Sequence, residues 1–388
     1  MSDIFVSALG QTDNIGDSAL RRGYLGALRY AGRLHVLVPD DDSYVSGLGL
    51  RAEDVCYRNR SKWRGAALRG VAGGHVGFAL NAGEATLDAD YTKYCGRIAA
   101  IAALARFRGS TVVIAGSGFR PGFQGDRPAD DSQVAAAPWP VRTLARRSAF
   151  VGWRDEQTRR AVNIGSVMPD WAFGLGQPSD RLLGAQHVID RDLLVVSLRA
   201  AGPALTPERG RQVRELADRS GLEPVVAVQV MRDNDLAEEI SKDNGFRCLP
   251  WRGGDHLERE AFLRLLYARS RWVISNRVHA LILGLTEGAI PLAPAELGAE
   301  KSVRIFDAAG ISKVSVPGSM QLATDASADR CLSELARART ALDLSARQLV
   351  DALAPGRADL LPTLSPASGH SGSNRLTRDE AAVEGRRT

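Results

Sequence analysis

Cysteine and long apolar runs are both scarce in this chain of 388 residues. Its four cysteines are scattered, without the paired spacing of a zinc site or a redox motif, and they are too few for a disulfide framework. No uncharged apolar stretch reaches the roughly 18 residues that a membrane span needs. The N-terminus also lacks a basic start followed by an apolar run. We therefore expect a cytoplasmic protein without a secretion signal.

Charge of one sign is not in large excess either. The chain carries 50 Lys and Arg against 45 Asp and Glu, a formal net charge of +5, which argues against a dedicated nucleic-acid-binding protein. The six histidines are not grouped with carboxylates or cysteines, so no metal site is expected. Hydrophobic residues make up 44% and charged residues 24%, which is typical of a globular protein.

Short β-branched runs alternate with longer helical patterns along most of the chain. Several of these runs are continuously apolar, as in parallel strands that are buried on both faces. The alternation predicts α/β layers around parallel sheets. The expected strands are Ile4–Ala8, Leu34–Pro39, Thr111–Gly116, Phe150–Gly152, Leu193–Leu198, Val225–Val230 and Trp272–Ser275. The expected helices are Ser18–Ala31, Tyr94–Arg108, Pro207–Ser220, Arg259–Arg269 and Asp325–Leu353.

The alternation is interrupted once, over Gly174–Arg191, where Gly, Pro and Asp replace the periodic pattern. A domain boundary there gives an N-terminal α/β domain over 1–175 and a C-terminal one over 190–354. From residue 355 the composition changes to Pro, Ser, Gly and mixed charge. Such a segment has too little apolar area to offset its ordering entropy, so 355–388 is predicted to be a disordered tail.

The first candidate motif, NIGDSAL, follows the opening strand and begins a helix. Gly16 allows a tight turn, and Asp17 or Ser18 can cap the helix. On this interpretation the motif is structural. If the loop instead lies at the carboxyl edge of a parallel sheet, where α/β proteins bind ligands, Asp17 can orient or deprotonate a hydroxyl group.

The second motif, VGWRDEQT, places Arg154 directly before an acidic helix start. Arg154 can pair with these carboxylates, or it can join the helix amides in holding an anion. Nearby, Asp170 in VMPDWAF lies at the domain boundary, where it can cap a helix, form part of a hinge or line a cleft.

The third motif runs from Trp272 to Pro294 and is the most informative. An apolar strand ends at Ser275 and an apolar helix begins near Val278, so Arg277 and His279 share a strand-to-helix turn. Unpaired amides and a guanidinium favour phosphate or carboxylate at such a turn. Separately, Arg277 can be paired with a local acid and His279 can be a core histidine. Lys301, further along, has the default interpretation of a solvated lysine.

Together these motifs resemble the polysaccharide pyruvyl transferase family over roughly residues 1–320. Members of that family carry an N-x-GD loop, an R-D/E helix start, a P-D segment, an S-x-R-x-H-A turn, a strand with Gly and Pro, and a downstream Lys. The matching residues occur here in the same order: Asn14, Gly16, Asp17, Arg154, Asp155, Pro169, Asp170, Ser275, Arg277, His279, Ala280, Gly288, Pro291 and Lys301. The Gly-rich middle stretch of the family is diverged here, as LNAGEATLDAD.

The resemblance implies two Rossmann-like α/β domains that face a cleft, a glycosyltransferase-B-like arrangement. It also implies transfer of pyruvate from phosphoenolpyruvate, as co-substrate, to sugar hydroxyls, forming a ketal on a cell-surface glycan or its precursor. No other cofactor is expected. The acceptor is a glycan or a lipid- or nucleotide-linked sugar, which makes peripheral contact with the inner face of the membrane conceivable.

The resemblance and chemical suitability also assign roles. His279 is the catalytic acid and Asp17 the base, whereas Arg154, Arg277 and Lys301 bind the donor. Asn14, Gly16 and Asp170 belong to the acceptor side or its loop. Two alternatives remain open: a nucleotide-sugar-dependent glycosyltransferase with the same architecture, and a catalytically inactive glycan-binding relative.

Overall fold

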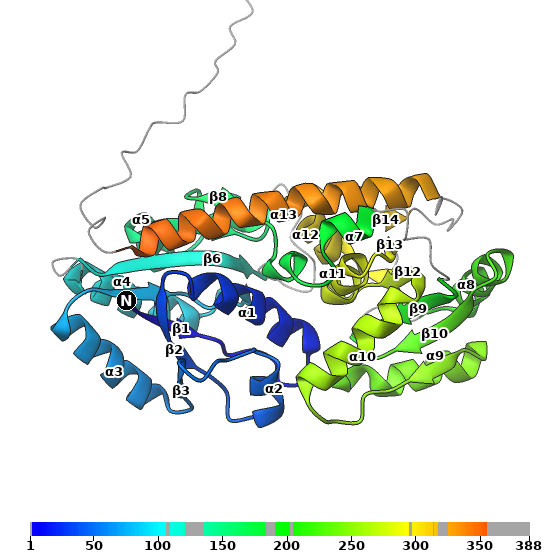
Figure 1. Cartoon of the computed structure of the whole chain (residues 1–388), viewed down its shortest axis with the longest axis horizontal. Coiled ribbons are helices and arrows are strands. Elements are labelled where there is room, and N and C mark those ends of the chain that lie inside the picture. The colour runs from blue at the N-terminus through cyan, green and yellow to red at the C-terminus, as the bar shows by residue number, and fades with distance from the viewer. Residues whose placement is uncertain are drawn as a thin grey trace, which may run out of the picture.

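The computed structural model describes residues 2–105, 109–120, 136–183, 191–201, 205–294, 297–312, 314–316 and 325–354. Within these residues the chain forms two α/β units, each built on a parallel sheet (Figure 1). The expected fold class, two Rossmann-like α/β domains with a cleft between them, is therefore confirmed. The predicted tail over 355–388 lies outside the described residues.

The first unit holds an eight-stranded sheet in the order β3-β2-β1-β4-β6-β7-β8, with β5 beside β6. Its strands are β1 (Ser2–Ser7), β2 (Gly32–Leu37), β3 (Val55–Tyr57), β4 (Val76–Ala79), β5 (Gly83–Ala85), β6 (Thr111–Phe119), β7 (Phe150–Trp153) and β8 (Ser166–Val167). Its helices are α1 (Ile15–Leu28), α2 (Asp42–Ser46), α3 (Arg60–Gly73), α4 (Ala89–Ala105), α5 (Trp139–Arg147) and α6 (Glu156–Val162). Buried apolar clusters cover both faces of the sheet, so the continuously apolar strands are accounted for.

A short 3-10 helix, η2 (Trp171–Gly174), and α7 (Ser179–Leu183) lead to the second unit. Its sheet has the order β11-β10-β9-β12-β13-β14. The strands are β9 (Leu193–Ser197), β10 (Glu223–Ala227), β11 (Arg247–Leu249), β12 (Ser270–Ser275), β13 (Ile290–Pro294) and β14 (Ser315–Val316). The helices are α8 (Pro207–Arg219), η4 (Met231–Asp233), α9 (Asn234–Asn244), α10 (His256–Ala268), α11 (Val278–Thr286) and α12 (Glu300–Ala308).

The strand order of both sheets indicates where a ligand site lies. In each, the first strand lies in the middle, with the second strand on one side and a later strand on the other: β2-β1-β4 in the first sheet and β10-β9-β12 in the second. In open parallel sheets ligands bind at such a topological switch point, outside the carboxyl ends of the strands. Each unit therefore offers one binding edge.

The last helix, α13 (Asp325–Leu353), has the bounds that the sequence predicts, but it amends the domain boundaries. Figure 1 shows it running across both units. Leu335 packs into the core of the second unit, whereas Leu349 and Leu353 are buried in the core of the first. Residues 190–354 are thus not a single unit, because the second half of α13 returns to the N-terminal domain.

Each of the seven expected strands is present, within a few residues of its predicted ends. Strands β4 and β5 and helix α3 escaped the sequence analysis, because they are short or rich in glycine and arginine and lack a clear apolar period. In the described part of the chain, no helix is both long and apolar enough to cross a bilayer.

Candidate functional site

A cavity of about 480 Å³ lies between the two units, where their switch points face each other. The loops after β1 and β4 line it from the first unit, and the loops after β9 and β12 line it from the second. It brings together six of the eight predicted site residues, from positions far apart in the chain: Asn14, Asp17, Arg154, Arg277, His279 and Lys301. Gly16 and Asp170 lie immediately behind its wall rather than on it.

The loop after β1 holds Asp17 at the edge of the cavity. Asn14 is the N-cap of α1, because its side chain accepts a hydrogen bond of 3.0 Å from the amide of Gly16. The expected cap at Asp17 or Ser18 is therefore wrong, because the helix begins three residues before Ser18, and Asp17 is free of the capping role. Its carboxylate accepts a 2.9 Å hydrogen bond from the Gln11 amide and lies 3.4 Å from Arg21. Burial alone raises the pKa of Asp17, but Arg21 and the Gln11 amide outweigh it and lower the pKa, so the group is anionic at neutral pH.

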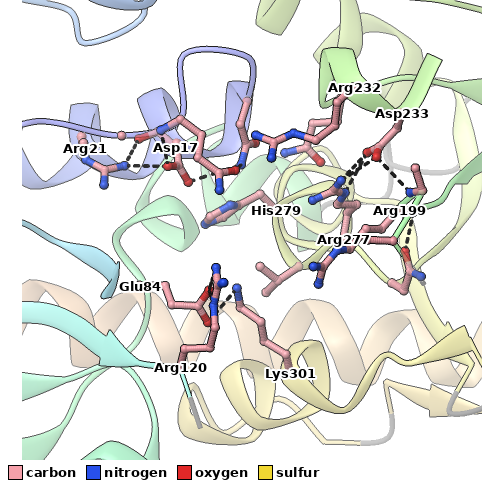
Figure 2. Close-up of a pocket in the computed structure, with 18 of the residues that line it drawn as sticks. Asp17, Arg21, Glu84, Arg120, Arg199, Arg232, Asp233, Arg277, His279 and Lys301 are labelled. Atoms are coloured by element: carbon pink, nitrogen blue, oxygen red, sulfur yellow. Dashed lines mark hydrogen bonds and ion pairs between the residues drawn. The ribbon is translucent and has the colours of Figure 1, made fainter. Parts of the chain in front are cut away.

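His279 lies at the centre of the site, in the first turn of α11 (Figure 2). Its ring packs directly on the backbone of Gly16, where an added Cβ atom would lie 2.3 Å from Nδ1. This close approach explains why a residue larger than glycine does not fit in the loop. The other ring nitrogen, Nε2, lies 3.6 Å from Oδ2 of Asp170.

Asp170 acts from behind the cavity wall. It is fully buried, it caps η2 through the Ala172 amide at 2.9 Å, and its Oδ2 faces both His279 and, at 3.8 Å, Arg154. Burial by itself raises the pKa of Asp170, but His279 and Arg154 together hold it below its usual value. A buried carboxylate this close to the ring fixes the orientation of His279. Asp170 is thus a positioning residue and does not contact the cavity.

Arg154 and Lys301 both pair with a carboxylate that the sequence analysis missed. Glu84, in the diverged stretch after β4, lies 3.1 Å from Lys301 and 3.6 Å from Arg154. Burial alone would raise the pKa of Glu84, but these two cations lower it to about 2. Lys301 therefore closes the site across the two units and is not a free surface lysine. Arg154 also lines the cavity, but its side chain is only 3% exposed.

Arg277 is held by a bidentate ion pair. Its Nε and Nη2 atoms donate to the two carboxylate oxygens of Asp233 at 2.8 and 2.6 Å. Ser275 fixes the turn, because its hydroxyl accepts a 2.8 Å hydrogen bond from the Arg277 amide. No side chain caps α11, so the positive end of this helix is directed at the cavity beside Arg277.

The sequence analysis also missed several cations around the cavity. Arg199 follows β9, is exposed on the rim, and has no carboxylate partner among the described residues. Arg232 pairs with Asp13 through Nε at 2.6 Å and joins the two units. No local motif marks these residues, and only their position after a parallel strand could have suggested them.

The cavity as a whole is strongly cationic. Seven Arg and Lys side chains and three carboxylates line it, an excess of four positive charges besides His279. Over the described ranges, no group of three or more His, Cys, Asp or Glu side chains is arranged to hold a metal ion. The arrangement can bind a polyanion and place one acid–base pair, His279 and Asp17, beside it.

No known protein family matches the chain, and no curated protein sequence matches it. Several solved structures are similar over nearly their whole length. The UDP-GlcNAc 2-epimerase from Neisseria meningitidis bound to UDP-GlcNAc is 10% identical, with a TM-score of 0.47, covering 91% of this chain and 99% of that one. MurG of Acinetobacter baumannii is 12% identical, with a TM-score of 0.45 and coverages of 91% and 99%.

Anabaena Alr3699/HepE in complex with UDP is 13% identical, with a TM-score of 0.44 and coverages of 91% and 97%. At these identities and scores the likeness bears on neither the substrate nor the activity.

Proposed function

We propose that the chain is a transferase that moves pyruvate from phosphoenolpyruvate to the hydroxyl groups of a sugar. One observation carries this proposal: residues that match the motifs of polysaccharide pyruvyl transferases, scattered from Asn14 to Lys301, line one cationic cavity. Chance matches to short motifs have no reason to converge in space. The excess of positive charge also suits this donor, which carries about three negative charges, counting up to two for the phosphate.

The second unit binds the donor in this proposal. Arg277, already oriented by Asp233, and the start of α11 face one anionic group, and Arg199 on the rim faces another. Lys301 lies across the cavity, where it can neutralise the departing phosphate. Arg154 contributes mainly by holding Glu84 and Asp170 in place, because its own charge is shared between them.

The acid acts on the donor and the base acts on the acceptor. His279 gives a proton to the methylene carbon of the enol phosphate, which leaves a cationic carbon that the sugar oxygen attacks while Asp17 takes the hydroxyl proton. Attack by a second hydroxyl displaces the phosphate and closes the ketal. Of the two hydroxyl protons, one replaces the proton of His279 and the other leaves with the phosphate, so the enzyme is regenerated.

A nucleotide-sugar-dependent glycosyltransferase is the second candidate, and the size of the cavity favours it. About 480 Å³ falls within the range of roughly 300–1,000 Å³ usual for larger organic ligands. Two features count against it. Asp233, the carboxylate that the described part of the second unit contributes to the lining, has both oxygens engaged by Arg277 and is not free to bind a ribose. Apart from His279, no described residue lining the cavity is aromatic.

Ligand-dependent thermal unfolding separates these candidates, because only a ligand of the native state raises the melting temperature. We expect phosphoenolpyruvate at millimolar concentration to raise it, and uridine diphosphate to leave it unchanged. Arg69→Gln, an exposed substitution on α3 outside the lining of the cavity, provides the control, and stabilisation by phosphoenolpyruvate should persist in it. Stabilisation by the nucleotide alone would exclude the pyruvyl transferase proposal.

A further inference from the structure

A second cavity, of about 630 Å³, lies wholly within the first unit. Helices α3 and α4 and the segment from β4 to β5 form its walls. It adjoins the cleft, because Leu9, Asn81 and Glu84 line both cavities. Asn81 and Glu84 thus separate this cavity from the one that Asp17 and His279 line.

Aromatic side chains give this cavity a rigid apolar wall. Trp63 is almost fully buried and is fixed by a 2.9 Å hydrogen bond from its indole nitrogen to the carbonyl of His35. Tyr91 and Tyr94 lie beside one another, with ring centroids 6.1 Å apart. Pockets with apolar and aromatic walls and a few polar groups are typical of sites for organic ligands.

Three arginines make this cavity cationic. Arg60 and Arg64 are one turn apart on α3, Arg97 lies on α4, and none of them has an ion-pair partner among the described residues. Arg60 and Arg64 face Tyr94, since their charges oppose the burial that raises its pKa to about 12.

The three carboxylates that line this cavity each have a partner of their own. Asp88 accepts a 2.7 Å hydrogen bond from the Tyr91 amide, Asp90 lies 3.8 Å from Lys93, and Glu84 is paired with Lys301. Counting Lys93, four cations and three carboxylates line the cavity, an excess of one positive charge, and none of these carboxylates pairs with the three arginines.

We propose that this cavity binds the phosphate of the acceptor, and hence that the acceptor is a sugar linked to a phosphate or diphosphate group. The proposal rests on the proposed function, because it presumes that a sugar is the acceptor in the cleft. Three unpaired guanidiniums suit a group with several oxygens and more than one negative charge, which arginine binds in bidentate fashion. The carboxylate of an acidic sugar would engage only one of them.

Binding without donor tests this inference independently of the reaction. Isothermal titration with an alkyl glucosyl diphosphate, the matching neutral alkyl glucoside and the matching alkyl glucuronide compares phosphate, no charge and carboxylate on similar ligands. We expect the diphosphate to bind at least about tenfold more tightly than either of the others. Arg60→Gln with Arg64→Gln should remove that advantage. Arg69→Gln, on the same helix but outside the cavity, should retain it.

Each result of these titrations either supports or overturns the inference. Equal binding of the three ligands, tighter binding of the glucuronide, or an unchanged diphosphate affinity in the double variant overturns the inference. The double variant must melt at the temperature of Arg69→Gln, and Arg97→Gln replaces it if it does not. If the diphosphate advantage depends on these arginines but phosphoenolpyruvate is never consumed, this inference stands and the proposed function fails.

Discussion

The two halves of the cleft differ in charge. The first unit lines it with Arg21, Arg120 and Arg154 against Asp17 and Glu84, so its charges nearly balance. The second unit lines it with Arg199, Arg232, Arg277 and Lys301 against Asp233 alone, and it adds His279. Both sheets have the same strand order around their central strand, so the difference comes from the loops and not from the fold.

This contrast assigns the two ligands to the two halves. A donor with about three negative charges gains most from the second unit, where the excess charge and the start of α11 lie. The nearly neutral first unit suits a sugar hydroxyl beside Asp17. Interdomain contacts fix this geometry. The carbonyl of Asp13 accepts a 2.8 Å hydrogen bond from the Met231 amide, and the carbonyl of Gln229 accepts one of 3.4 Å from the Ile15 amide.

The largest expected effect comes from removing the acid of the second unit. His279→Asn should reduce turnover by about 10²- to 10⁴-fold, because no other group at that position can deliver the proton. Steady-state phosphate release with donor and acceptor gives the rate, and titration with phosphoenolpyruvate shows whether the donor still binds. Turnover within a few-fold of the wild type contradicts the role of His279.

Replacing the planar guanidinium group of Arg277 should have the next largest effect. Arg277→Lys keeps the charge but cannot make both hydrogen bonds to Asp233, so the cation is no longer held toward the donor. We expect the affinity for phosphoenolpyruvate to fall about tenfold or more in a calorimetric titration. An unchanged affinity removes Arg277 from the donor site. Arg21→Lys, in the opposite half, is the matched control and should leave donor affinity nearly unaltered.

The ion pairs of Glu84 across the cleft should make the free energy of unfolding depend on pH. The pKa of Glu84 is lowered from 4.5 to about 2, so its contribution is fully present above about pH 4.5 and is lost as the pH falls toward 2. Glu84→Gln should therefore lose up to about 3 kcal/mol of unfolding free energy at pH 7. Denaturant unfolding at pH 7 and pH 3 should show this deficit shrinking at the lower pH. A deficit that does not change with pH argues against the Glu84 pairing.

The smallest effect is expected at the rim of the first unit. Arg120 also pairs with Glu84, at 3.2 Å, but its side chain is 49% exposed. Exposed pairs contribute about 1 kcal/mol at most, so Arg120→Gln should change the melting temperature only slightly. A loss as large as that of Glu84→Gln would mean that the rim, and not Lys301 and Arg154, holds Glu84.

Many of the strands and helices could be predicted from the sequence, because the patterns that mark them are local. Buried parallel strands such as Leu193–Ser197 are continuous apolar runs, and α13 shows its period over 29 residues. Asp155 marks a helix start by ordinary capping chemistry, whereas the cap of α1 is Asn14 and not Asp17 or Ser18 as the sequence analysis expected. The convergence of Asp17 with His279 was predicted by resemblance alone, because it depends on which strands are central.

The remaining site residues left no such signal. Glu84 lies in a stretch without periodicity, and its partners Arg154 and Lys301 are remote in the chain. Asp170 could be recognised as a cap, but its second oxygen faces His279 only because η2 packs against both α1 and α11. The return of α13 to the first unit is likewise a tertiary event, since the pattern of one amphipathic helix does not say which core it covers.

Product analysis tests the central claim most directly. The protein is incubated with phosphoenolpyruvate and a panel of glycosides, and the glycosides are examined by mass spectrometry while phosphate is measured. We predict a glycoside that has gained one pyruvate ketal, with one phosphate released per ketal and none released when the glycoside is omitted. Glycosides that stay unmodified with phosphoenolpyruvate but gain a sugar from a nucleotide sugar would contradict the account.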